Sequence, residues 1–338
     1  MPLSPEARKA LEARLRYLES VSGITIDADT HVSDPARLPP DVNAALRASP
    51  DYFHGKPMSG DDLIAEMDMA SVDGALTWQN PSATAYTDSQ SESYDALLAA
   101  NATIAEAACT YPERIFPAGW TDPRALGVDG AIRMIDTGVD RFGFPIIKLN
   151  PAQNGFRIDS EPVLACVDRI VARGAFPAFH YGADTPFTPP EGFAAIAMRH
   201  PTVTVIGVHM GGGGAGYVEG ERHAQESRRM LHDLPNVFFI ESAKRDTHIE
   251  SDLIDAATSS DAAWRRIAVG SDAPYGRMTW NFGGCRLMLA SLASGEHPDP
   301  RLRDAPILID AEKTAGYLGD NIRGLLIDAG RRVLAQAD

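Results

Sequence analysis

The sequence predicts an α/β fold, a (β/α)8 barrel with an N-terminal helix and a long loop after the first strand. Short apolar runs alternate eight times with amphipathic stretches, and this alternation predicts parallel strands joined by helices. Eight is the number of units that closes such a barrel. An open doubly wound sheet is the alternative, but the chain lacks the G-x-G-x-x-G phosphate motif that would favour it.

The first helix is expected within residues 2–20, where apolar residues recur at helical spacing. The expected strands are 24–29, 74–78, 115–120, 145–149, 176–180, 202–209, 237–241 and 267–272. The expected helices between and after them are 61–70, 91–109, 125–137, 161–173, 190–198, 219–231, 249–257, 276–293, 310–317 and 320–327. Residues 32–60 contain five prolines and are expected to form a long irregular loop, typical of functional lids or walls. Residues 1–338 are expected to form one domain.

The composition restricts the classes of partner. The chain carries 31 Lys and Arg against 46 Asp and Glu, a net charge of −15, which disfavours binding to nucleic acid or to a membrane surface. An anionic substrate would need a local basic pocket. Three scattered cysteines, no signal peptide and no long apolar run predict a cytoplasmic protein. Its expected partner is a small-molecule substrate.

Acidic residues and histidines gather at the ends of the expected strands. Asp29 and His31 end the first strand, His180 ends the fifth, His209 the sixth and Asp272 the eighth. Side chains alternate along a strand, so Asp27, Asp29 and His31 are expected on one face. Because strand ends of a barrel converge on one mouth, these residues predict a site for one divalent metal ion. Carboxylate and imidazole ligands suit Zn²⁺, Mn²⁺ or Fe²⁺.

Other residues at or just past strand ends are candidates for contact with the substrate, although a structural role is equally compatible with each one alone. They are Trp78, Trp120, Lys148, Glu241, Lys244, Arg245, Tyr275 and Arg277, with His54 reaching in from the long loop. An arginine here would hold a substrate carboxylate through two hydrogen bonds. Lys148 is expected to face the substrate or to pack inside the barrel.

These motifs together resemble the amidohydrolase superfamily, in particular the branch that includes aminocarboxymuconate-semialdehyde decarboxylase and γ-resorcylate decarboxylase. The resemblance runs from Ile24-Thr25-Ile26-Asp27-Ala28-Asp29-Thr30-His31, through Val208-His209-Met210-Gly211-Gly212 and Gly270-Ser271-Asp272, to the closing segment 317–326. It implies that Asp29, His31, His180 and Asp272 are the metal ligands. His209 would be a ligand or a contact of the substrate. The resemblance also implies a homodimer.

The resemblance implies a reaction at a carbonyl or carboxyl group. The leading expectation is hydrolysis of an amide, lactone or ester by water that a Zn²⁺ ion activates, with Asp272 taking the proton and His209 stabilising the oxyanion. The alternative is non-oxidative decarboxylation of an aromatic or enoic acid. Many hydrolytic members carry His where this chain has Asp29, whereas members with an acid there include decarboxylases. A barrel that only binds a ligand is a third reading, and it would require the metal set to be vestigial.

Overall fold

The computed structural model describes residues 2–48, 56–183, 186–212, 222–294 and 309–337. Its strands lie close to the expected apolar runs. They are β1 (Ile26–Val32), β2 (Gly74–Gln79), β3 (Ile115–Pro117), β4 (Gly119–Trp120), β5 (Ile146–Leu149), β6 (Phe176–His180), β7 (Val205–Val208), β8 (Val237–Glu241) and β9 (Ile267–Val269). The expected third strand is therefore split in two at Ala118.

The helices of the first half of the chain are α1 (Pro5–Ser20), α2 (Pro40–Ala48), α3 (Gly60–Ala70), η1 (Pro81–Ala83), α4 (Gln90–Thr110), α5 (Pro123–Phe142), α6 (Pro151–Asn154) and α7 (Glu161–Ala172). Those of the second half are α8 (Pro190–Arg199), α9 (Arg222–Asp233), α10 (Asp246–Ser259), α11 (Asp261–Trp264), α12 (Met278–Ala293), α14 (Ala311–Ala315), the π-helical turn η3 (Gly316–Asp320) and α15 (Asn321–Ala337). None of the described helices combines the length and apolarity that a membrane crossing requires.

The strands form a parallel barrel. Regular pairing runs through β1-β2-β3 and through β4-β5-β6-β7-β8-β9. The Ala118 amide donates to the carbonyl of Thr77 at 3.0 Å and joins the two sheets. On the other side, the Asp272 amide donates to Asp29 O at 2.8 Å, and the His31 amide donates to Ala273 O at 2.7 Å. These bonds link the segment that follows the last strand to the first strand, and the α/β barrel expected from the sequence is confirmed.

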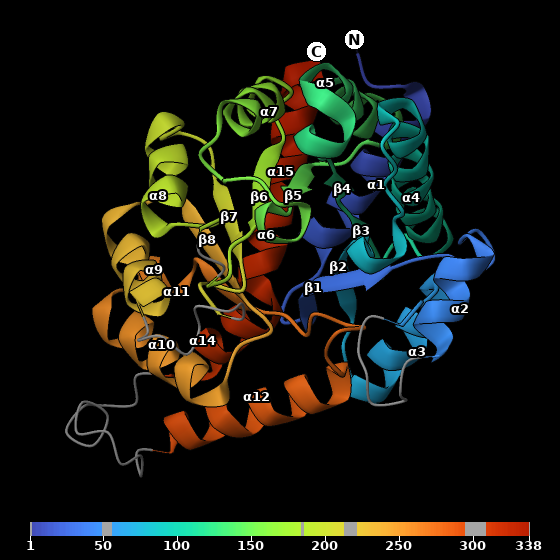
Figure 1. Cartoon of the computed structure of the whole chain (residues 1–338). Coiled ribbons are helices and arrows are strands. Elements are labelled where there is room, and N and C mark those ends of the chain that lie inside the picture. Colours follow the sequence, from blue (N-terminus) through green and yellow to red (C-terminus); the bar gives the residue numbers. More distant parts are fainter. Residues whose placement is uncertain (1, 49–55, 184–185, 213–221, 295–308, 338) are drawn as a thin grey trace.

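Helices surround the strands, and the two ends of the chain meet on the same side of the molecule, where α1 packs against α15 (Figure 1). The layer between β8 and α8 shows how the helices are held. The Phe239 ring stacks on Phe193 at 5.5 Å between centroids and on Tyr181 at 6.0 Å, and all three side chains are fully buried. Burial of each such ring contributes about 2–3 kcal/mol.

The stretch after the first strand differs from the expected irregular loop, because it contains α2 and the start of α3. Its prolines misled the sequence interpretation, since proline is tolerated in the first turn of a helix and Pro40 is the first residue of α2. Ser59 and Asp62 form a capping box that begins α3, each side chain bonding the other's amide, at 3.2 and 2.9 Å. His54 lies outside the described residues.

Candidate metal centre and active site

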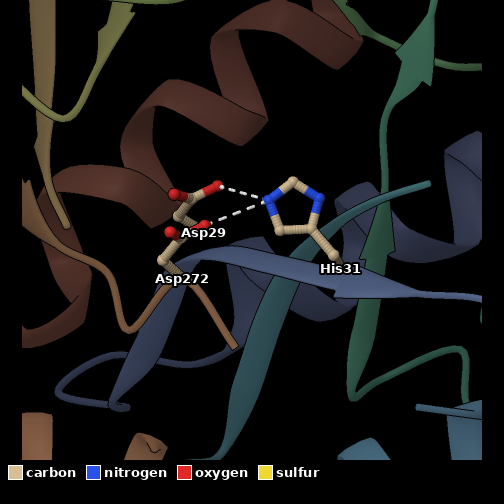
Figure 2. A group of neighbouring side chains, drawn as sticks. All are labelled: Asp29, His31 and Asp272. Carbon is tan, nitrogen blue, oxygen red and sulfur yellow. Dashed lines mark ion pairs between the residues drawn. The ribbon is translucent and has the colours of Figure 1, made fainter. Parts of the chain in front are cut away.

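Three of the expected ligands meet at the mouth of the barrel. Asp29 and His31 come from β1, and Asp272 follows β9. Nε2 of His31 lies 3.6 Å from Asp29 Oδ1 and 3.2 Å from Asp272 Oδ1 (Figure 2). One ligand atom from each of the three residues lies within 4.8 Å of the others. Asp272 is the most exposed of the three, with 13% of its side chain accessible.

The hydrogen bond at Nδ1 of His31 determines whether Nε2, which faces the two carboxylates, carries a hydrogen or a lone pair. Nδ1 of His31 lies 2.8 Å from the carbonyl oxygen of Gln79, and a carbonyl only accepts, so Nδ1 carries the hydrogen. In the neutral ring, Nε2 then has a lone pair that faces two carboxylate oxygens. Three acceptors that face one another form a donor set suited to a cation, and an imidazole oriented through its other N–H is typical of metal ligands. The donor set therefore fits a divalent ion.

Asp29 is fully buried and is held by neighbours on both oxygens. Oδ1 accepts from Trp78 Nε1 at 2.8 Å and from Lys148 Nζ at 3.2 Å, and Oδ2 accepts from the Ser242 hydroxyl at 2.7 Å. Burial by itself raises the pKa of Asp29, but the charge of Lys148 and contacts with His31, His209 and Ser242 together hold it below the usual value. Asp29 is therefore a charged carboxylate, as a cation site requires.

Asp27 does not join the cluster, although strand alternation placed it on the same face. The pairing of β1 with β2 shifts register between Asp27 and Thr30. Oδ1 of Asp27 accepts the amide hydrogens of Asp29 at 3.0 Å and of Ser271 at 2.9 Å. Asp27 thus ties the end of β1 to the segment that carries Asp272. Burial raises its pKa to about 7, against the effect of the hydrogen bonds from Ser271 and Asp29.

His180 and His209 form a pair beside the cluster, and His180 is not among the three clustered ligands. Nδ1 of His180 lies 3.1 Å from Nε2 of His209. On its other side, Nδ1 of His209 lies 2.8 Å from the Ser242 hydroxyl, which also bonds Asp29. Burial, followed by the neighbouring His180, lowers the pKa of His209 to about 4. His209 is therefore neutral near pH 7.

Lys148, Trp78 and Trp120 line the inside of the barrel below the cluster. Nζ of Lys148 lies 4.6 Å from the ring centroid of Trp78 and 5.4 Å from that of Trp120. All three side chains are almost fully buried. Nε1 of Trp120 is buried and has no hydrogen-bond partner among the described residues, so the site contains one donor that is unsatisfied within the protein.

Tyr275 also stands at the mouth. Its ring meets the His31 ring edge-on at 5.6 Å, and its hydroxyl donates to Asn80 Oδ1 at 2.8 Å. Neither candidate arginine belongs to the cluster. Arg245 is exposed and forms the N-cap of α10, and Arg277 pairs with Glu66 at 2.7 Å.

Strained backbone is concentrated here. Five non-glycine residues of the described chain have positive φ, and four of them are His209 (79°), Met210 (44°), Ala243 (47°) and Asp272 (57°). Such conformations cost roughly 1–3 kcal/mol each and persist where the surroundings impose them, often at functional sites. These four residues follow β7, β8 and β9, so the unfavourable conformations occur where strands end at the mouth.

Ser242 and Gln79 are the site residues that sequence reasoning missed. Each directly follows a residue already placed at a strand end, Glu241 and Trp78 respectively. Their position after a strand end could have indicated that they belong to the site. Serine and glutamine are common in loops, so the residue types themselves did not indicate it. Their importance comes from the partners that the fold brings to them.

With this geometry established, comparison with known proteins defines the class. A family model described as amidohydrolase matches residues 26–323, so the chain belongs to that family and is an enzyme of the amidohydrolase superfamily. This confirms the resemblance in the motifs. No curated protein sequence matches the chain significantly.

Solved structures of similar fold cover almost the whole chain at low identity. A TIM-barrel protein from Bordetella bronchiseptica is 17% identical, with a TM-score of 0.57, covering 90% of this chain and 100% of that one. A 2,6-dihydroxybenzoate decarboxylase is 15% identical, with a TM-score of 0.61 and coverage of 90% and 98%. A 5-carboxyvanillate decarboxylase from Novosphingobium aromaticivorans, complexed with manganese and a nitrobenzoic acid, is 15% identical, with a TM-score of 0.62 and coverage of 90% and 96%. These similarities show the fold.

Proposed function

We propose that this enzyme is a metal-dependent, non-oxidative decarboxylase of aromatic carboxylic acids that carry a hydroxyl group beside the carboxylate. The observation that carries the proposal is the arrangement of His31 Nε2 against the oxygens of Asp29 and Asp272, a donor set suited to a divalent cation. The related folds named above include two kinds of aromatic acid decarboxylase, and structures of both kinds contain manganese. The comparisons thus favour the alternative from the sequence over hydrolysis, and manganese over zinc.

Asp29, His31 and Asp272 would hold the metal ion, with His180 and His209 beside them. When bound, the ion supplies positive charge that holds the substrate carboxylate and the adjacent oxygen. The residues of the protein would bind the substrate and transfer the proton. The net charge of −15 repels anions in general, and the buried ammonium group of Lys148, 3.2 Å from Asp29, would reduce the negative charge that an anionic substrate meets at the site.

Trp120 provides a hydrogen-bond donor for a substrate that carries carboxylate or phenolic oxygens. Its buried Nε1–H lacks a partner among the described residues, and leaving such a donor unsatisfied costs about 1–3 kcal/mol. A carboxylate or phenolic oxygen at this point would accept that hydrogen. The rings of Trp120 and Tyr275 also meet the His31 ring edge-on, so aromatic side chains lie directly beside the cluster.

Asp272 is placed to move the proton. Its carboxyl group is partly exposed at the mouth, 3.2 Å from His31. In the proposed reaction, Asp272 in its protonated form gives the proton to the ring carbon that bears the carboxylate. The carbon–carbon bond then breaks, its electrons return to the ring, and CO₂ leaves. Asp272 recovers a proton from solvent, so the net change is one proton taken up and one CO₂ released.

The test uses purified protein loaded with Mn²⁺ and a panel of hydroxybenzoic acids with ¹³C-labelled carboxyl groups. We expect labelled CO₂ and, in D₂O, one deuterium on the product ring where the carboxylate was. Asp272→Asn should remove turnover, whereas Asp233→Asn, at an exposed position on α9, should not. Turnover of lactones, esters or amides with no CO₂ from any acid in the panel would refute decarboxylation and favour the hydrolysis first expected.

A further inference from the structure

We propose that Ser242 is a positioning residue that sets the proton-bearing nitrogen of His209 and links that histidine to Asp29. The kinetic part of this inference rests on the proposed function. Ser242 follows β8, and its side chain is almost fully buried. Its hydroxyl lies 2.7 Å from Asp29 Oδ2 and 2.8 Å from His209 Nδ1, so one side chain joins residues from β1 and β7.

The direction of these hydrogen bonds follows from counting hydrogens. The Asp29 carboxylate only accepts, so the single hydroxyl hydrogen of Ser242 goes to Asp29. The Ser242 oxygen must then accept from His209, and Nδ1 of His209 must carry the hydrogen. The backbone carbonyl of Ser242 leads to the same result, because it lies 3.3 Å from the same nitrogen and can only accept.

The other nitrogen of His209 is determined as a consequence. A neutral imidazole carries one ring hydrogen, so Nε2 of His209 presents a lone pair. Nδ1 of His180, at 3.1 Å, must then donate to it. The hydrogen bonds run in one direction, from His180 through His209 and Ser242 to Asp29. Asp29 therefore lies at the accepting end of this series of hydrogen bonds and His180 at the donating end.

The turn that carries Ser242 is held in place by two contacts of Lys244. The hydroxyl and carbonyl of Ser242 both face His209, and the next residue, Ala243, has a φ of 47°, a conformation unfavourable for alanine. Lys244 then pairs with buried Asp252 and donates to the carbonyl of Met210 at 3.0 Å. Residues 242–244 therefore contact residues 209–210 through the side chains of Ser242 and Lys244 and through the backbone carbonyl of Ser242. These contacts hold Ser242 in a fixed position relative to His209.

The experiment records long-range ¹H–¹⁵N NMR spectra of protein labelled with ¹⁵N-histidine, in chelator and without substrate. A His209→Gln variant assigns the His209 signals. We expect the Nδ1–H form of His209 in the wild type and in Ser242→Thr, which keeps the hydroxyl. In Ser242→Ala the Nδ1–H resonance should shift, because only the more distant backbone carbonyl, at 3.3 Å, is left to accept this hydrogen. Ser251→Ala, which removes a hydroxyl on α10 that bonds Thr247, should leave the spectrum unchanged.

The kinetic readout is measured on the Mn²⁺-loaded enzyme. Ser242→Ala should lower kcat about 10- to 100-fold with little change in KM, and Ser242→Thr should recover most of the loss. A wild-type His209 with the hydrogen on Nε2, or an unchanged Nδ1–H signal in Ser242→Ala, overturns the proposal. If Ser242→Ala does not fold, the wild-type spectrum and Ser242→Cys, whose thiol is a weak donor, decide it. The spectra need no substrate, so a protein inactive on every acid refutes only the proposed function.

Discussion

Lys148→Met tests the charge balance beneath the candidate metal centre. Nζ of Lys148 lies 3.2 Å from Oδ1 of Asp29, and the two side chains are 1% and 0% exposed. Methionine has almost the same length and fills the same space, so packing changes little. Asp29 would keep its hydrogen bonds from Trp78 and Ser242 but would lose the nearest full positive charge.

The size of the effect follows from burial. Removing one partner of a buried ion pair costs about 3–5 kcal/mol, because the other charge is left uncompensated in a medium that solvates it poorly. We expect Lys148→Met to lower the free energy of unfolding by this amount. Replacing Asp29 with Asn in the same protein should restore part of the loss, since no charge is then left unpaired.

The assay is urea unfolding at pH 7 with chelator present, followed by tryptophan fluorescence. Lys313→Met is the matched control, because Lys313 pairs with the largely exposed Asp261 at 3.4 Å, and such a pair contributes about 0–1 kcal/mol. A loss below about 1 kcal/mol for Lys148→Met, equal to the control, would refute the reasoning. Asp29 would then be stabilised by its neutral hydrogen bonds alone.

Three further predictions concern single residues. Trp120→Phe keeps the ring but removes the unsatisfied Nε1–H, so urea unfolding should show equal or slightly greater stability, while KM for the proposed acids should rise about tenfold. Burial raises the pKa of Asp27 in the folded state to about 7. The contribution of this residue to the free energy of unfolding is therefore complete below about pH 4, and it is lost as the pH rises towards 7. Asp27→Asn should therefore gain stability relative to the wild type over that interval, in unfolding curves recorded at several pH values; a constant difference would contradict this. Gly319→Ala should lower the free energy of unfolding by about 1–3 kcal/mol or more, because the added methyl group would overlap the carbonyl of Ile24. Gly324→Ala, with open space at its Cβ, should raise the free energy of unfolding by about 0.5–1 kcal/mol. Equal thermal midpoints for the two variants would disprove this prediction.

Local pattern was sufficient for the class of fold and for most of the candidate ligands. Alternating apolar runs and amphipathic stretches reflect the burial of strands and of one helix face, and that burial pattern is visible in single segments. Asp29, His31 and Asp272 were found because strand ends of a barrel share one mouth. Boundaries were less accurate. Proline at the start of α2 resembled loop composition, and the interruption at Ala118 left an apolar run that reads as one strand.

The sequence by itself determined the barrel and the residue types at its mouth, because both follow from short-range periodicity. The tertiary structure alone decided which of these groups meet. His180 pairs with His209 outside the cluster of three, Lys148 is directed at Asp29, and Ser242 joins two strands that are far apart in the chain. Hydrogen bonds and ion pairs act over about 3 Å, so their partners are set by how the strands are arranged around the barrel, and separation along the sequence carries no record of that arrangement.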